Sequence, residues 1–192
     1  MSEYLLSVVF GIVEGITEFL PISSTAHLRI VEAMAGISLK DDYWKMYSVV
    51  IQLGAIISVL VYFRKRIVQF LQSFPRGKYG DRTFFTHPLT LTLIAFVVTA
   101  GPAYILKKTV IDKNLENLWV IGTSLMVGGV IMWAVDSIFR KPRTLNMEQM
   151  STPQAIWVGL VQILSAVFPG TSRSMSTIAA GQTAGMSREA AL

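Results

Sequence analysis

The sequence contains no cysteine and few charged residues. Disulfide bonds, thiolate nucleophiles and cysteine-based metal sites are therefore excluded. Lys, Arg, Asp and Glu make up only 15% of the 192 residues, whereas a soluble domain has about a quarter. Hydrophobic residues make up 52% of the chain, and the mean hydropathy is +0.52. This composition is typical of a membrane protein.

Two further features are missing. The N-terminal residues "MSEYLL" start acidic and are not followed by a small-residue cleavage site, so we expect no cleaved signal peptide. No nucleic-acid recognition motif is present. The net charge of +5 therefore does not indicate nucleic-acid binding, because basic residues in a membrane protein usually mark cytoplasmic loops.

Three stretches are each about 20 residues long and almost uncharged: residues 43–63, 87–106 and 118–139. A helix rises about 1.5 Å per residue, so each stretch can cross a hydrocarbon core of about 30 Å. The sequence therefore predicts a polytopic membrane protein built from helices.

The loops between these spans differ in charge. The first loop and the segment after the third span are rich in basic residues, which predicts a cytoplasmic location for both. The first loop carries one acidic residue, Asp81, and six basic residues: Arg64, Lys65, Arg66, Arg76, Lys78 and Arg82. The segment after the third span carries one acidic residue, Glu148, and three basic residues: Arg140, Lys141 and Arg143. The mixed segments at residues 38–42 and 107–117 are then expected outside; they carry Lys40, Asp41 and Asp42, and Lys107, Lys108, Asp112, Lys113 and Glu116.

An internal repeat links the two ends of the chain. Residues 10–25 resemble residues 158–173 at an offset of 148 positions, with Pro21 opposite Pro169 and Ser24 opposite Ser172. The alternative is chance similarity between two apolar helices. Because three spans separate the copies, the second copy enters the membrane from the opposite side, as in inverted-topology repeats with broken helices.

The predicted fold is therefore all-α. Residues 1–192 form a single transmembrane domain, with a first repeat at about 1–106 and a second at about 116–192. Each repeat contains a re-entrant hairpin of two helices broken at a proline. The second repeat ends soon after its hairpin, so the chain is expected to be truncated at its C-terminus.

The breaks after the two prolines carry hydroxyl groups. Ser23 or Ser24 is expected to cap a new helix, and Thr171 or Ser172 to cap its counterpart. Helix N-termini carry partial positive charge and free N–H groups, so two that converge would bind an anion, above all phosphate. Arg173 adds a fork of donors that matches phosphate. The alternative is that the hydroxyl groups only cap helices.

Ionisable residues in the first hairpin are costly at membrane depth and therefore indicate a functional site. Glu14 and Glu18 lie on one helix face, and with Gln162, the repeat counterpart of Glu14, they could line a polar cavity that holds a hard cation. Structural ion pairs are the alternative. His27 can serve as a general acid or base or as a nucleophile, whereas His87, just before Pro88, suits a structural role.

The distinctive residues are not duplicated. At the same offset, the counterpart of Arg173 is Thr25 and that of His27 is Met175. A symmetric transport path has less need for this asymmetry than an enzyme active site.

The segments "EGITEFLPISSTAHL" and "PGTSRSMST" resemble the two signatures of the bacterial undecaprenyl-diphosphate phosphatases of the bacitracin-resistance type. Residues 50–56, "VIQLGAI" with Gln52, resemble a third shared segment. The resemblance implies an integral enzyme of the bacterial cytoplasmic membrane. It would remove the terminal phosphate of undecaprenyl diphosphate and so recycle the lipid carrier used for peptidoglycan. It also implies a divalent cation, Mg²⁺ or Ca²⁺, as cofactor.

By position, the resemblance assigns roles to individual residues. The expected catalytic residues are Glu18, Ser24, His27 and Arg173; phosphate binding falls to Arg173, Ser23, Ser24, Thr25, Thr171, Ser172 and Ser174; metal binding falls to Glu14 and Glu18; and Gln52 and Gln162 support the site. The diphosphate is expected to enter from the outer side of the membrane. His27 or Ser24 then attacks phosphorus, or one of them activates water, and Glu18 could instead orient His27 as a base.

The main alternative function is a secondary transporter or lipid flippase, because inverted repeats are common in transporters. A purely structural subunit would leave Glu14, Glu18 and Arg173 without a role. The small-residue stretch at residues 122–129 is suited to close helix packing, either within the chain or between two copies as a homodimer.

Overall fold

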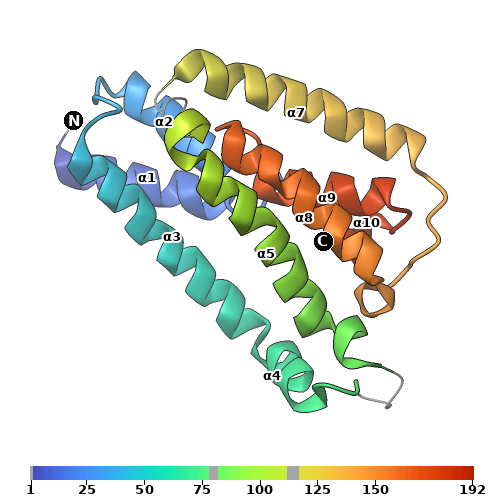
Figure 1. Cartoon of the computed structure of the whole chain (residues 1–192). Helices are drawn as coiled ribbons and strands as arrows, with labels where there is room; N and C mark the ends of the chain where they lie inside the picture. Colours follow the sequence, from blue (N-terminus) through green and yellow to red (C-terminus); the bar gives the residue numbers. More distant parts are fainter. Residues whose placement is uncertain (1, 78–81, 112–116) are drawn as a thin grey trace.

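The computed structural model describes residues 2–77, 82–111 and 117–192. Over these residues the chain forms helices and no β-strand, so the prediction of an all-α fold is confirmed. The elements, shown in Figure 1, are α1 (Glu3–Thr17), α2 (Ser24–Met34), α3 (Asp42–Tyr62), α4 (Arg64–Ser73), η1 (Phe84–Thr86), α5 (Pro88–Leu106), η2 (Lys107–Ile111), α7 (Leu118–Ile138), η3 (Met147–Gln149), α8 (Thr152–Val167), α9 (Arg173–Thr183) and α10 (Arg188–Ala191).

The three predicted spans are helices α3, α5 and α7, and their ends agree with the sequence prediction to within one residue. Each is long and apolar enough to cross a membrane, and most of its side chains face the outside of the molecule. Caps fix where they begin: Asp41, His87 and Asn117 accept hydrogen bonds from the first N–H groups of α3, α5 and α7. The molecule is thus a multi-pass membrane protein.

Several residues behind the predicted membrane orientation lie outside the described part of the chain. They are Lys78, Asp81, Asp112, Lys113 and Glu116, and the side chain of Lys108 is likewise not described. The side of the membrane on which each loop lies therefore stays a prediction.

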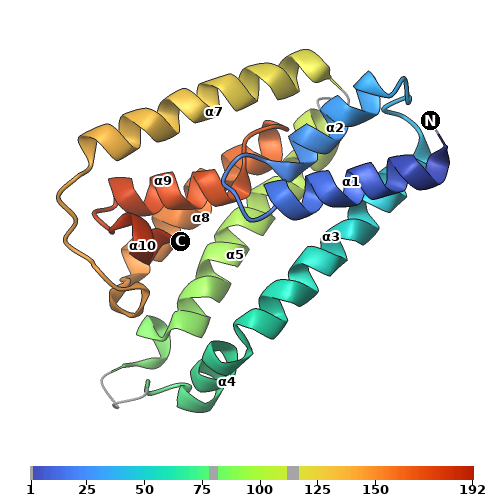
Figure 2. The same ribbon diagram turned by 180° about the vertical axis from the view of Figure 1, so that it is seen from behind.

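Two helical hairpins, α1–α2 and α8–α9, lie against the long helices (Figure 2). The open end of the first is tied to the beginning of α3, where the Tyr47 hydroxyl donates to the Ser7 carbonyl at 3.0 Å. The open end of the second lies by the beginning of α5, where the Thr152 hydroxyl donates to the Phe85 carbonyl at 3.2 Å. Because α3 and α5 are successive spans, they begin at opposite ends of the bundle, and so the two hairpins open toward opposite ends.

The two hairpins also have the same local construction. Ser23 caps α2 and Ser172 caps α9, and both helices are 11 residues long. Both end at a glycine with positive φ, Gly36 at 72° and Gly185 at 84°. Glycine is the residue that adopts this left-handed conformation at a helix C-terminus without strain.

This construction corrects the alignment of the repeat by one residue. The sequence comparison paired Ser24 with Ser172, whereas the structure makes Ser23 the equivalent of Ser172. The reason is that the second hairpin has one more residue between its proline and its cap. Arg173 therefore corresponds to Ser24 rather than to Thr25, and each is the first residue of its helix. The inverted-topology repeat itself, as a statement about the membrane, stays a prediction.

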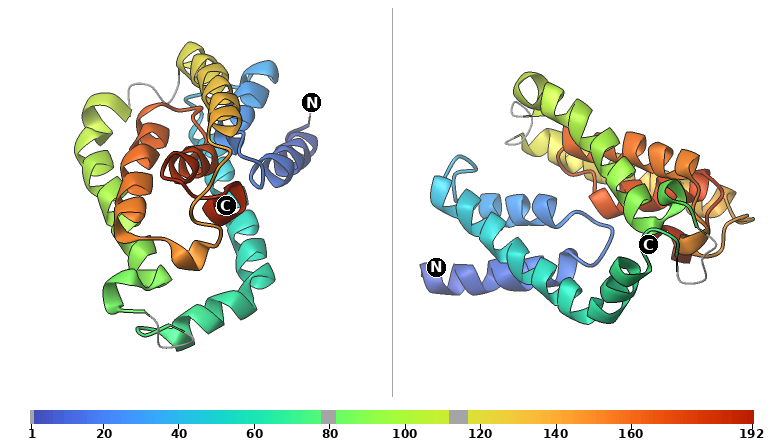
Figure 3. Two further views of the ribbon diagram at one scale, coloured as in Figure 1. Left: turned by 90° about the vertical axis from the view of Figure 1, so that its right-hand side faces the viewer. Right: turned by 60° about the horizontal axis from the view of Figure 1, so that its bottom comes forward.

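The helices form two groups, which the right panel of Figure 3 shows side by side: α1, α2 and α3 in one, and α5, α7, α8 and α9 in the other. Apolar residues fill the interior of each group. The first group is built on Leu6, Phe10, Leu28 and Trp44. The second is built on Met132, Val135, Met175, Ile178 and Ala179.

Small residues set the closest helix contacts in the second group. A Cβ at Gly159 of α8 would lie 2.7 Å from the Ala95 carbonyl oxygen of α5, so only glycine allows this approach. In the small-residue stretch at 122–129, Gly128 lies against the Met175 side chain, whereas a Cβ at Gly122 or Gly129 would have open space. This stretch therefore packs partly within the chain.

Candidate active site

The two hairpin tips meet at the carboxylate of Glu18. The Ser24 hydroxyl donates a hydrogen bond of 2.5 Å to Glu18 Oε2, and Arg173 Nη2 lies 4.0 Å from Glu18 Oε1. Ser24 is the first residue of α2 and Arg173 the first of α9. Glu18 is therefore the point at which the starts of both broken helices converge.

The backbone around Ser23 explains the contact between Ser24 and Glu18. Ser23 has a φ of 67°, and it is the one non-glycine residue with positive φ among those that the structure describes. A serine in this conformation is strained, and such strain is common at functional sites. Its hydroxyl accepts from the N–H of Ala26 at 3.4 Å. The turn thus starts α2 and returns Ser24 to the carboxylate that precedes it.

In the second hairpin, Gly170 places Arg173. Gly170 has a φ of 105°, and a Cβ at this position would lie 2.4 Å from the carbonyl oxygen of Ile121 in α7. The loop can therefore lie against α7 only because residue 170 lacks a side chain. Ser172 then caps α9 by accepting from the N–H of Met175 at 3.3 Å.

The exposure of the charged groups suits an anion site. The Arg173 side chain is 65% exposed and the Glu18 side chain 24% exposed. At 4.0 Å the ion pair is loose, so most of the guanidinium donors remain available to another partner. A phosphate could be held there bidentately, with support from the N–H groups at the two helix starts.

Glu14 lies one helical turn before Glu18 and is buried. Neither of its carboxylate oxygens has a hydrogen-bond partner among the described residues, and its electrostatic neighbours are Glu18, Ser24 and Arg173. A buried carboxylate without a donor is costly unless a cation or a proton compensates it. The described residues contain no group of three or more His, Cys, Asp or Glu side chains able to hold a metal. Two carboxylates nevertheless fit Mg²⁺, which takes its other ligands from phosphate and water.

His27 is half-buried on α2, and its Nδ1 lies 2.8 Å from the Ser23 carbonyl oxygen. A carbonyl can only accept, so Nδ1 carries a proton and donates this bond. No hydrogen bond between His27 and Glu18 is found in the described part of the chain. Glu18 is bonded to Ser24 instead, which favours Ser24 over His27 as its partner.

The remaining predicted site residues divide into two sets. Ser23, Thr25, Thr171, Ser172 and Ser174 lie within two residues of the helix starts. Gln162 is turned toward α5, where its Oε1 accepts from the Thr99 hydroxyl at 3.4 Å, and it lines a separate cavity of about 390 Å³. Gln52 forms no hydrogen bond with any described residue. Neither Gln162 nor Gln52 is bonded to Glu14 or Glu18 among the described residues, and their supporting roles stay predictions.

Sequence reasoning missed one buried group. Glu32 of α2 is fully buried, pairs with Arg29 at 2.7 Å and accepts from the Ser48 hydroxyl of α3 at 3.3 Å. This pair fixes α2, and with it Ser24 and His27, against the first long helix. The signal was present in the sequence as two opposite charges three residues apart in a membrane-embedded segment.

The fold and the site together define a class: a multi-pass α-helical membrane protein with a carboxylate, a hydroxyl and a guanidinium gathered where two helix N-termini meet. The family described as "Bacitracin resistance protein BacA" matches residues 7–192, and the chain belongs to this family. The prediction of the bacitracin-resistance type is confirmed.

Curated relatives carry a more specific name. The chain is 59% identical over 193 residues to the "Undecaprenyl-diphosphatase" of Koribacter versatilis, covering 100% of this chain and 67% of that protein. It is 39% identical to "Undecaprenyl-diphosphatase 1" of Frankia alni (96% and 66% covered). It is 38% identical to the "Undecaprenyl-diphosphatase" of Caldanaerobacter subterraneus (100% and 68% covered). The chain thus spans about two thirds of the length of these relatives.

Proposed function

We propose that this protein hydrolyses undecaprenyl diphosphate to undecaprenyl phosphate and inorganic phosphate. This reaction recycles the lipid carrier for cell-wall synthesis and confers resistance to bacitracin. The observation that carries the proposal is the meeting of Glu18, Ser24 and Arg173, contributed by two separate hairpins. The names of the curated relatives supply the substrate.

Binding depends on Arg173. Its exposed guanidinium and the N–H groups at the starts of α2 and α9 hold the terminal phosphate, while the isoprenoid tail stays in the lipid. Donors held where negative charge develops in the transition state are an effective form of electrostatic catalysis.

For the chemical step we propose Ser24 as the nucleophile, because it is the candidate that is bonded to a base. The Ser24 oxygen forms a bond to the terminal phosphorus, its proton passes to Glu18, and the anhydride bond breaks to release the lipid monophosphate. Water then attacks the phosphorylated serine and gives its proton to Nε2 of His27. Inorganic phosphate leaves, and Ser24 recovers its proton from Glu18.

A divalent cation, Mg²⁺ or Ca²⁺, is part of the proposal. Glu14 and Glu18 would hold it, since both oxygens of Glu14 are buried without a donor in the described structure. When bound, the cation supplies neutralisation of charge on the phosphate oxygens.

We also propose that the protein resides in the bacterial cytoplasmic (inner) membrane with the site open to the outer side. The basic segments at residues 64–66 and 140–143, on the same side of the predicted spans, support this orientation. Open space beside Gly122 and Gly129 of α7 would admit a second copy and give a homodimer.

The test is phosphate release from undecaprenyl diphosphate by the purified chain. We expect Arg173→Lys to lower kcat/KM by about 10²- to 10³-fold, because a lysine keeps the charge but cannot donate two parallel hydrogen bonds to one phosphate. Arg140→Lys is the matched control and should leave the rate unchanged, since Arg140 is exposed and far along the chain from the hairpin tips. Equal rates for both variants would contradict the assignment.

A second measurement addresses Ser24 and the rival transporter function. Stopping the reaction with acid should trap phosphate on the Ser24 peptide, detectable by mass spectrometry, and Ser24→Ala should abolish this adduct. A normal rate in Ser24→Ala would remove serine as nucleophile. Movement of the lipid across vesicles without phosphate release would favour the transporter instead.

A further inference from the structure

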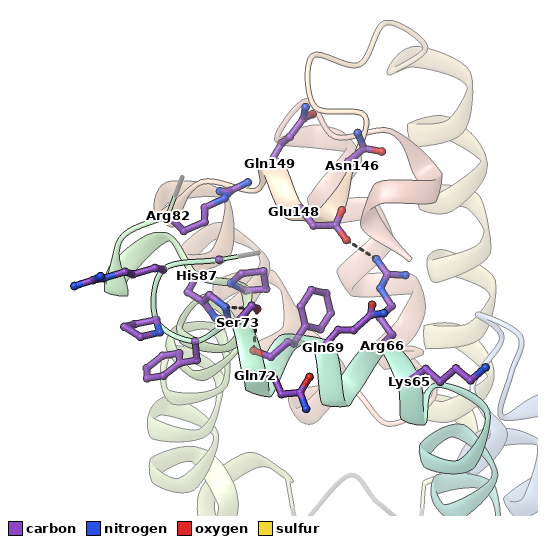
Figure 4. Close-up of a pocket in the computed structure, with 16 residues that line it drawn as sticks. Lys65, Arg66, Gln69, Gln72, Ser73, Arg82, His87, Asn146, Glu148 and Gln149 are labelled. Atoms are coloured by element: carbon purple, nitrogen blue, oxygen red, sulfur yellow. Dashed lines mark hydrogen bonds and ion pairs between the residues drawn. The ribbon is translucent and has the colours of Figure 1, made fainter. Parts of the chain in front are cut away.

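A large cavity lies at the end of the molecule where α3 ends and α5 begins (Figure 4). Its volume is about 1320 Å³, which exceeds the usual range of small-molecule sites, roughly 300–1,000 Å³. It is bounded by α4, by residues 74–77 and 82–87 before α5, and by η3 just before α8. None of its lining residues belongs to the Glu18 site.

The cavity is strongly basic. Lys65, Arg66, Arg76 and Arg82 line it, and among the described lining residues the one carboxylate is that of Glu148. Nη2 of Arg66 forms an ion pair with Oε1 of Glu148 at 3.0 Å. Figure 4 marks this contact with a dashed line. Lys65 and Arg76 form no hydrogen bond or ion pair with the residues that the structure describes. The wall of the cavity therefore carries positive charge that no described residue neutralises.

Helix α4 separates this charge from an apolar surface. Its polar face lines the cavity with Lys65, Arg66, Gln69, Gln72 and Ser73. The opposite face exposes Val68 and Leu71 at 46% and 59%, and no residue of α4 is buried. A basic amphipathic helix directly after a membrane span is typical of a helix that lies in the membrane interface, with its apolar face among the acyl chains.

The far end of α4 is held in place by His87, whose side chain is fully buried. Nδ1 of His87 accepts from the N–H of Leu89 at 3.3 Å, so its proton must be on Nε2, which lies 3.2 Å from the Ser73 hydroxyl oxygen. This bond fastens α4 to the beginning of α5. The cavity is therefore formed before any ligand binds.

We propose that this cavity binds the phosphate head group of an anionic membrane phospholipid. Lys65 and Arg76 contact the phosphate, and the acyl chains extend into the bilayer around α4. The charge that no described residue neutralises favours an anion, and the interfacial position of α4 favours a lipid head group as that anion. The site lies apart from Glu18 and does not depend on the proposed hydrolysis.

The experiment measures lipid retention. The purified chain in a non-ionic detergent is titrated with phosphatidylglycerol or with phosphatidylcholine, and the lipid bound per chain is counted by native mass spectrometry. We expect phosphatidylglycerol to be retained preferentially. Lys65→Gln and Arg76→Gln should each weaken its binding about fivefold, and together about thirtyfold. The matched control is Arg64→Gln with Arg140→Gln, which removes the same charge outside the cavity and should bind as the unmodified chain does.

Three results would overturn the proposal. Equal losses in the cavity pair and the control pair would mean general surface charge, and equal retention of the two lipids by the unmodified chain would mean no anion site. Displacement of phosphatidylglycerol by inorganic phosphate at the same concentration would identify free phosphate as the occupant. Lys65→Arg with Arg76→Lys keeps both charges and should retain the lipid, which separates lost binding from lost folding.

Discussion

At the scale of single residues, the site depends on Glu18, whose carboxylate accepts from the Ser24 hydroxyl and lies 4.0 Å from the Arg173 guanidinium. Glu18 and Arg173 stand out because ionisable side chains in apolar segments are costly. The 2.5 Å bond from Ser24 to Glu18 depends on the unusual φ of Ser23, which no sequence pattern reveals. Gln162 was expected to line one polar cavity with Glu14 and Glu18; its Oε1 accepts from the Thr99 hydroxyl, and its supporting role stays a prediction.

A glycine at the site gives a prediction at this scale. Gly170→Ala should destabilise the protein by about 2–4 kcal/mol, because the new Cβ would meet the Ile121 carbonyl and φ is 105°. Gly36→Ala is the matched control: its φ is also positive, but a Cβ would have open space, so its cost should be only about 1 kcal/mol. Thermal unfolding in one detergent measures both, and equal losses would show that contact with α7 does not constrain the loop.

At the scale of elements, apolar length and the near absence of charge were enough to place the three spans to within one residue. Caps also predicted both broken hairpins, because Ser23 and Ser172 act as N-caps. The short amphipathic α4 was not predicted as an element. Its sequence was interpreted only as a basic loop, since ten residues with scattered apolar positions give a weak helical signal.

The contact between α4 and α5 predicts a pH dependence. Burial, with a smaller contribution from the nearby Arg82, lowers the pKa of His87 from its usual value of 6.5. The folded protein therefore resists protonation of His87, and the stabilisation from this contact is complete above pH 6.5 and is lost as the pH falls toward the lowered pKa.

The comparison is with His87→Asn, whose side chain can still cap α5 but does not titrate. Between pH 7.5 and 5.5 the unmodified protein should lose about 2–4 °C of melting temperature relative to the variant. Parallel melting curves across this range would show that the histidine is not buried in its neutral form.

At the scale of the whole molecule, the two hairpins open toward opposite ends of the bundle, which three successive spans require if the chain crosses the membrane each time. A sequence repeat could suggest this arrangement, but only the contacts of Tyr47 with Ser7 and of Thr152 with Phe85 fix the end at which each hairpin opens. The Glu18 site and the basic cavity therefore differ in position as well as in chemistry. The Glu18 site lies where the two groups of helices meet, because Glu18 and Ser24 come from the first group and Arg173 comes from the second. The basic cavity lies instead at the end of the molecule where α3 ends and α5 begins.

This arrangement predicts the accessibility of single cysteines, which can be introduced cleanly because the chain contains none. Lys40→Cys lies between α2 and α3, and Arg140→Cys follows α7. With three spans between them, the two positions lie on opposite sides of the membrane. In intact cells a membrane-impermeant maleimide should label Lys40→Cys, and it should label Arg140→Cys only after the membrane is permeabilised. Labelling of both in intact cells would mean that one span does not cross, and the two hairpins would then open toward the same side of the membrane.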